Sequence, residues 1–242
     1  MDTATELSVV PTKVARALSV IALVLVAAGV AGQIAKYFLG HDELKGFVHL
    51  FDLDQEANVP AFFSVLLILI CAFLLALTAI LEKRQQTPHA SKWAVLSVGF
   101  LLMGYDEAFS LHERTIVPMR ELLGGGDLGP LYLAWVVPGA TLVLVLGLYF
   151  HRFLLHLPQH ARNRFLAAAT LYLGGAIGME LLGGWWAEAN GMDNWEYSAF
   201  ATTEESLEIA GLIYLIFALL AYHADGRVEV HVRLDGPVST GE

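Results

Sequence analysis

Acidic side chains close the third apolar run of this sequence. Between Tyr105 and Glu113 the chain reads Tyr-Asp-Glu-Ala-Phe-Ser-Leu-His-Glu, which places Asp106, Glu107, His112 and Glu113 close together. An Asp at the centre of a bilayer costs about 2.5 to 3.5 kcal/mol, so two adjacent carboxylates inside a span require water, a proton, a cation or a base beside them. The pattern therefore predicts a functional polar site.

Two later apolar runs carry acids of the same kind. Glu180 lies in the fifth run, and Glu204, Glu205 and Glu208 lie at the start of the sixth. At 1.5 Å per helical residue, the expected depths of Asp106, Glu180 and Glu208 below the outer membrane boundary are about 10, 9 and 7 Å. Three helices are therefore predicted to bring carboxylates to one layer.

The helical faces agree with this layer in part. Asp106 and Glu113 are seven residues apart, so they share a face of the third helix, whereas His112 lies about 120° from Asp106. On the sixth helix, Glu204, Glu205 and Glu208 form one stripe. His112 is therefore expected to reach a neighbouring group instead of the same ligand point.

Clustered carboxylates with one imidazole are typical ligands for iron, manganese or zinc, and a cation would offset their mutual repulsion. We therefore predict a metal site, with Glu107 or Glu208 free to act as the general base. The candidate metal ligands are Asp106, Glu107, His112, Glu113, Glu180, Glu205 and Glu208, with His49, Glu56 and Glu204 as a second tier. No nucleotide cofactor is expected, because Gly124-Gly125-Gly126 has no following Lys-Ser or Lys-Thr pair.

The helices that must position these acids are long and apolar. Hydrophobic residues make up 56% of the 242-residue chain, and charged residues make up 16%, which indicates a polytopic membrane protein. We expect an all-α bundle of six transmembrane helices in a single domain, residues 1–242. The predicted spans are residues 14–39, 60–81, 93–112, 131–155, 165–186 and 203–222.

The distribution of basic residues predicts the orientation of the bundle. Positively charged loops resist translocation, and only Lys36, Lys45, Arg114 and Arg120 fall on the side opposite the termini. Both termini, including a short tail at residues 223–242 with an alternating valine pattern, are therefore expected in the cytoplasm. The acids gather on the other side, so the acidic face is expected to point towards the periplasm of a bacterial inner membrane.

Simpler interpretations stay open for single residues. Glu205 could close a capping box that begins at Thr202, and Glu113, Glu204 and His112 could lie at the water boundary. The deeper acids could be paired structurally with Lys36, Arg114 or Arg120. His41 and His49 could be ordinary loop residues, and the Asp52, Asp54, Glu56 spacing lacks the Gly and Glu of a calcium loop. The Gly174-x-x-x-Gly178 step predicts close approach of another helix.

Several of these segments together resemble a family of uncharacterised bacterial multipass membrane proteins. The resemblance is carried by Asp106-Glu107-Ala108-x-x-x-His112-Glu113, the loop from Asp52 to Pro60, Glu180-Leu-Leu-Gly-Gly and Thr203-Glu204-Glu205-x-x-Glu208. It implies the fold and a bacterial cytoplasmic membrane, and it implies no activity.

Four functions fit these observations. The first is a lipid-active metalloenzyme with a lipophilic substrate, and the second is a proton- or cation-coupled transporter or channel. The third is a non-catalytic subunit or assembly factor of a membrane complex, and the fourth is an acidic docking surface for a basic partner. Membrane lipids, a membrane-protein partner or a second copy of the chain are the expected partners. Nucleic acid is excluded, because the net charge is −10 and phosphate binding requires clustered Lys and Arg.

Overall fold

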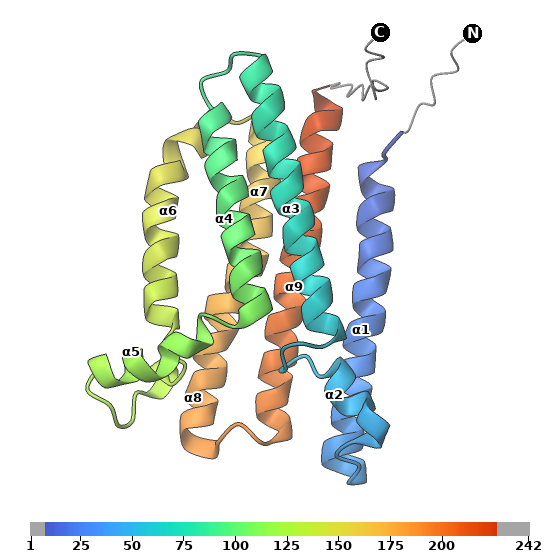
Figure 1. Ribbon diagram of the computed structural model, residues 1–242, viewed down its shortest axis with the longest axis vertical. Coiled ribbons are helices and arrows are strands. Elements are labelled where there is room, and N and C mark those ends of the chain that lie inside the picture. The colour runs from blue at the N-terminus through green and yellow to red at the C-terminus, as the bar shows by residue number, and fades with distance from the viewer. Residues whose placement is uncertain (1–7, 227–242) are drawn as a thin grey trace, which may run out of the picture.

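The computed structural model describes residues 8–226, which form a bundle of helices (Figure 1). Shorter elements join the long helices at one end of the bundle: η1 (Leu44–Gly46), α2 (Phe47–Phe51), η2 (Glu113–Thr115), α5 (Ile116–Leu122) and η3 (Gly129–Leu131). The long elements are α1 (Pro11–Leu39), α3 (Val59–Arg84), α4 (Ala90–Phe109), α6 (Val136–His156), α7 (Gln159–Leu173), the π-helical η4 (Gly174–Met179), α8 (Glu180–Asn190) and α9 (Trp195–Asp225).

Five helices in the described part of the chain are long and apolar enough to cross a membrane, with α7, η4 and α8 counted as one. A sixth is reached when α4 is joined to the η2–α5 segment across a bend of 74°. The start of α1 and the end of α9 lie at the same end of the bundle, which agrees with an even number of crossings (Figure 1). We call the opposite end, which holds α2, α5 and the α8–α9 connection, the loop end.

Helix α9 occupies the middle of the bundle and packs against α1, α3, α7 and α8. Its contact with α3 is built from fully buried residues, including Leu67 and Cys71 on α3 and Leu212 and Ile216 on α9. The Cys71 thiol donates to the Leu212 carbonyl over 3.8 Å. Cys71 lies in an apolar run and could have faced lipid or packed against another helix. Because it is fully buried, it is a packing residue.

Helix α6 stands apart from this core. Phe150 and Phe153 are buried near one end and Val136 at the other, but Leu142, Leu144 and Leu148 between them are each more than half exposed. An apolar helix with this exposure suits contact with lipid chains.

Two helix ends differ from the predicted limits of the spans. The third span was expected to reach His112, but α4 ends at Phe109 because Ser110 adopts the left-handed conformation, with φ of 47°. The sixth was expected to begin at Thr203, but α9 begins at Trp195, where the Asn194 side chain accepts from the Tyr197 amide over 2.9 Å. The capping box at Thr202 is therefore excluded, since Thr202 lies inside the helix.

The predicted helix approach at Gly174 and Gly178 is also misplaced by one position. A Cβ atom at either residue would meet nothing within 4 Å, whereas one at Gly175 would lie 2.7 Å from the Glu204 carbonyl oxygen. Gly211 on α9 makes the reciprocal contact, because a Cβ there would lie 2.7 Å from the Tyr172 nitrogen. These two glycines therefore set the distance between the α7–η4 segment and α9.

The predicted tail begins later than expected. Helix α9 continues to Asp225, so residues 223–225 are helical. Residues 227–242 of the predicted tail, with the valine alternation, lie outside the described residues.

Candidate functional site

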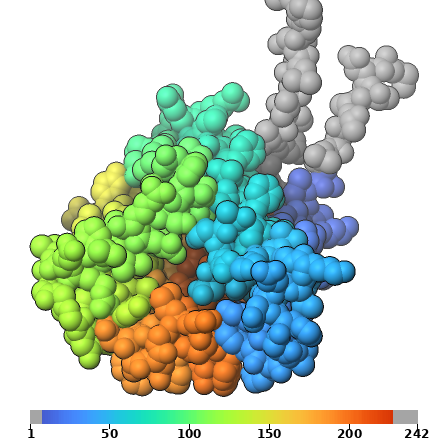
Figure 2. Space-filling view, turned by 60° about the horizontal axis from the view of Figure 1, so that its bottom comes forward, coloured from blue at the N-terminus to red at the C-terminus, as the bar shows by residue number. Residues whose placement is uncertain are grey.

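The face of the bundle at the loop end is hollowed (Figure 2). The rim of the hollow is formed by the segment before α3, the segment after α4 and the end of α8, and α9 is visible at its bottom (Figure 2). We call this hollow the acidic chamber. The name refers to six carboxylates on the segments around this hollow, whose charges act on one another: Glu56, Glu107, Glu180, Glu204, Glu205 and Glu208. Of these, Glu56 is exposed and the other five are half-buried, which suits groups that line a water-filled space.

The chamber carboxylates are close enough for their charges to interact across helix boundaries. Glu107 on α4 interacts with Glu56 of the α2–α3 loop, and Glu205 on α9 interacts with both Glu107 and Glu208. Glu208 in turn interacts with Glu180 across the α8–α9 contact. The predicted convergence of acids from the third, fifth and sixth spans therefore occurs, with Glu107 in place of Asp106 as the contribution of the third.

Two further contacts organise the wall formed by η4, α8 and α9. The Trp135 indole N–H donates to Glu180, and the Glu180 and Glu204 carboxylates lie close enough for their charges to interact. Two neighbouring carboxylates favour a bound proton or a cation between them. Tyr172 lies against Glu208 from the neighbouring turn of α7.

Asp106 and His112 are joined directly, contrary to the expected 120° separation on one helix. Because the helix breaks at Ser110, the chain folds back and Asp106 accepts from the His112 amide over 2.8 Å. The His112 Nδ1 atom lies 2.9 Å from the other Asp106 oxygen, and its ring packs on Trp135 with centroids 4.7 Å apart. This contact leaves His112 Nε2 without a partner among the described residues. The same break removes Glu113 from the face of Asp106 and leaves it exposed.

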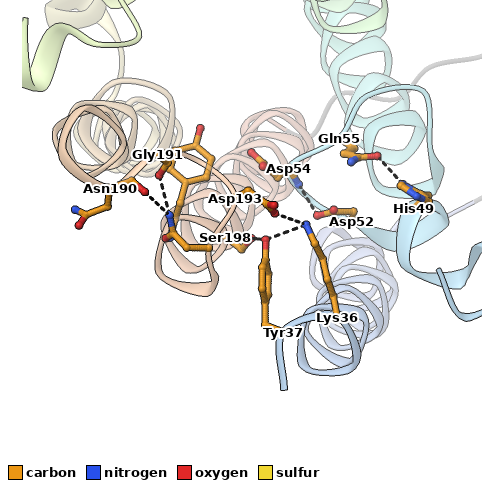
Figure 3. A network of polar contacts seen from close by, with 12 residues as sticks. Lys36, Tyr37, His49, Asp52, Asp54, Gln55, Asn190, Gly191, Asp193 and Ser198 are labelled. Carbon is orange, nitrogen blue, oxygen red and sulfur yellow. Dashed lines mark hydrogen bonds and ion pairs between the residues drawn. The ribbon is translucent and has the colours of Figure 1, made fainter. Parts of the chain in front are cut away.

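The bases at the loop end do not neutralise the chamber. Lys36 pairs with Asp193 over 2.9 Å and Arg120 pairs with Glu188 over 3.4 Å, and Arg114 forms no ion pair within residues 8–226. Figure 3 shows Lys36 reaching Asp193 while the Tyr37 hydroxyl contacts Ser198, so this network ties α1 to the α8–α9 connection. Within the described residues, no Lys or Arg pairs with a chamber carboxylate, and the alternative of structural pairing is wrong for these residues.

Acids in the α2–α3 loop respond to this excess of negative charge. Partial burial, followed by the charges of Asp52 and Glu180, raises the pKa of Asp54 to about 7. Burial and the charge of Glu113 raise the pKa of Glu56 as well. At the α8–α9 connection the effect is opposite, because hydrogen bonding to Lys36 lowers the pKa of Asp193. The loop end therefore holds separate paired and unpaired acidic regions.

The loop histidines lie outside the chamber. His49 Nδ1 contacts the Gln55 side chain over 3.1 Å, and His41 is exposed on the connection after α1. The structure adds Asp54, Trp135 and Tyr172 to the residues that surround the chamber. Trp135 and Tyr172 lie in apolar runs, where nothing in the sequence separates an aromatic residue that contacts a carboxylate from one that only packs.

The arrangement of side chains does not form a closed metal site. Within residues 8–226, no three His, Cys, Asp or Glu side chains are placed around one point at metal-binding distance. The donor chemistry nevertheless suits a cation, because it combines several unpaired carboxylates with an imidazole nitrogen that has no partner. Binding would require rotation of half-buried Glu side chains towards a common point.

Replacing Asp106 with Ala is expected to lower the unfolding free energy by about 1–2 kcal/mol, because the His112 amide and ring would lose a charged acceptor. Thermal unfolding in detergent measures the effect. The matched control is Glu113→Ala, which removes an exposed acid from the same turn and is expected to change stability by less than about 0.5 kcal/mol. Equal effects of the two variants would show that the Asp106–His112 contact does not hold the turn.

These features define a class of protein: a helical bundle with five or six membrane-length helices and an acidic chamber at one end. The chain belongs to the family described as Domain of unknown function (DUF8692), whose model matches residues 17–223. That range runs from α1 to the last turn of α9 and includes every chamber carboxylate. Neither the curated proteins nor the solved structures contain a match to this chain.

Proposed function

We propose that this protein is an integral membrane protein whose acidic chamber binds a divalent metal cation in the outer half of a bacterial inner membrane. The proposed metal supports an enzymatic reaction on a lipid or another lipophilic substrate. The observation that carries the proposal is the convergence of carboxylates from one loop and three helical segments without a Lys or Arg partner among the described residues. Such a group of acids requires protons or cations to remain folded.

The Asp106–His112 contact favours a metal over protons alone. A metal-bound histidine commonly donates its second ring N–H to a carboxylate, which orients the ring and fixes the tautomer. With the proton on Nδ1, His112 presents Nε2 as a ligand, and Asp106 acts as the orienting carboxylate. Glu107, on the same chain segment, is near enough for its charge to act on His112. Iron, manganese and zinc all accept such a mixed nitrogen and oxygen donor set.

A lipophilic substrate is supported by a groove beside the chamber. The groove has a volume of about 290 Å³ and lies between α1 and α9, lined by residues that include Val30, Ile34, Phe38 and Trp195. Its lining also includes Gln33, Thr202 and Thr203, and Thr203 directly precedes the chamber residue Glu204 in the chain. An acyl chain in this groove would place its polar end near the chamber, where Glu107 or Glu208 would serve as the general base.

Elemental analysis of protein purified without chelators tests the proposal. The wild-type protein is expected to carry at least one equivalent of metal, and His112→Ala and Glu107→Gln are expected to lose most of the metal held at His112. The control is Glu121→Gln, because Glu121 is an exposed acid at the same end of the bundle and its loss should leave the metal content unchanged. A folded wild-type protein that is free of metal and gains no thermal stability from divalent cations would contradict the proposal.

The closeness of Glu180 and Glu204 favours one alternative, a proton-coupled transporter, because two neighbouring carboxylates favour a bound proton that can be exchanged. The remainder of α9 argues for binding over transport, since residues 209–222 contain no charged side chain to continue a path. Proton flux in liposomes, with Glu204→Gln as the variant, separates the two functions. Flux that this variant abolishes would favour the transporter.

A further inference from the structure

One hydroxyl group near the chamber is buried without a partner. The Ser64 side chain on α3 is 3% exposed, and its Oγ atom forms no hydrogen bond with any described residue. Thr78, Thr141 and Thr170 show the usual arrangement in this protein, since each donates to the carbonyl four residues before it. A buried hydroxyl without a partner is unfavourable, so its position suggests a ligand that supplies the missing contact.

The face of α3 that carries Ser64 is turned towards α9. Cys71 lies seven residues after Ser64 and donates to the Leu212 carbonyl, and Thr78 lies seven residues further on and contacts His223 over 2.8 Å. Positions seven apart share nearly the same face of a helix. The Ser64 hydroxyl therefore points to the α3–α9 contact.

Ser64 is level with two chamber carboxylates. Helices α3 and α9 both run from the loop end to the opposite end (Figure 1). Counting back seven residues along each helix from the Cys71–Leu212 contact therefore places Ser64 at the level of Glu205. Helix α4 runs the other way, and a Cβ at Gly104 would lie 3.2 Å from Ile68. One turn from that contact towards the loop end places Glu107 at the level of Ser64.

We infer that Ser64, Glu107 and Glu205 bound a second cation position at the floor of the acidic chamber, deeper than His112. The inference rests on the proposed function and deepens it by naming the class of ion. All donors at this position are oxygen atoms, from one hydroxyl and the neighbouring carboxylates. Oxygen-only sites favour hard cations such as Mg²⁺ or Mn²⁺, whereas the imidazole of His112 also suits zinc and iron.

The first test compares Ser64→Ala with the wild-type protein by thermal unfolding and by Mn²⁺ titration in detergent. Without divalent cations, the variant is expected to melt at a higher temperature, because it lacks the unpaired buried hydroxyl. With Mn²⁺, the wild-type protein gains stability and the variant gains less, and its Mn²⁺ affinity falls about tenfold. The melting temperature of the variant therefore exceeds that of the wild-type protein by less and less as Mn²⁺ is added.

The matched control is Ser97→Ala. Ser97 is also buried on a membrane-length helix, but its hydroxyl donates to the Ala72 carbonyl over 2.8 Å. Its replacement should not raise the melting temperature and should leave the gain from Mn²⁺ unchanged. A Ser64→Ala variant that behaves like Ser97→Ala would overturn the inference.

A second variant tests the identity of the ligand atom. Ser64→Cys keeps the side chain short and replaces a hard oxygen with a soft sulfur, so the preferred ion should change from Mn²⁺ to Cd²⁺. An unchanged preference overturns the inference. Metal binding that persists in both Ser64 variants and is lost in His112→Ala would overturn only the deeper position, whereas a wild-type protein without any metal affinity would overturn the proposed function too.

Discussion

Replacing Glu205 with Gln is expected to raise the melting temperature of the cation-free protein at pH 8 and to reduce the stabilisation by Mn²⁺. The charges of Glu208 on its own helix and of Glu107 on α4 act on Glu205, so the change removes repulsion from both. Groups that interact in this way typically couple by about 0.5–3 kcal/mol. The measurement is thermal unfolding with and without Mn²⁺.

A double-mutant cycle shows whether the effect arises from convergence. Glu107→Gln and Glu205→Gln lie on different helices, so a non-additive effect of the two changes reports their proximity. The control cycle pairs Glu205→Gln with Glu121→Gln, which lies outside the chamber and should be additive within about 0.5 kcal/mol. Additivity in both cycles, or a loss of stability in Glu205→Gln, would contradict the arrangement of the chamber.

Replacing Gly211 with Ala is expected to destabilise the protein by about 1–3 kcal/mol. A Cβ atom there would lie 2.7 and 2.9 Å from the Tyr172 nitrogen and Cα, and backbone atoms cannot move aside as a side chain can. Gly175→Ala should act in the same way, through the Glu204 carbonyl and the Glu208 side chain. Both changes move Glu208, so they should weaken cation binding as well as stability.

The control for these glycine changes is Gly99→Ala. Gly99 lies inside α4, and a Cβ atom at this position would meet nothing within 4 Å. The variant should be neutral or more stable by up to about 1 kcal/mol, because Ala is favoured over Gly within a helix. If Gly211→Ala melts as Gly99→Ala does, the close approach of α7 and α9 is incorrect.

Much of the helical architecture could be predicted from the sequence. The apolar runs matched membrane-length helices because hydropathy over about 20 residues reflects a physical length that any helix must satisfy. The closeness of Glu180 and Glu208 agrees with the expected depths, which were counted from a constant rise per residue. These predictions needed only local information and the direction of each helix.

The predictions that failed concern places where polar residues extend or interrupt a helix. Residues 195–202 include Glu196, Ser198 and Thr202, so the sixth apolar run begins only after them. Helix α9 nevertheless begins at Trp195, after the Asn194 cap. At Ser110 no Gly or Pro signals the left-handed residue that ends α4. The direct contact of Asp106 with His112 follows from that break, so it could not be predicted from positions on a continuous helix.

Which glycine of the α7–η4 segment contacts α9 depends on tertiary packing. Gly174, Gly175 and Gly178 all lie in one small-residue segment, and a spacing rule selects the pair that matches a known motif. The π-helical winding of η4 changes which of them faces α9. Ser64 gives no signal at all in the sequence, because a serine in an apolar run ordinarily bonds to its own helix.

The π-helical segment η4 also determines which side chain faces the chamber wall. A residue inserted into an α-helix rotates everything beyond it by about 100°, and η4 accommodates such a surplus directly before Glu180. If these same residues wound as a plain α-helix, every side chain beyond them would turn by about 100°, and the carboxylate of Glu180 would leave this wall. The acidity of the wall is therefore set by the winding of the preceding turn as much as by the identity of the residue itself.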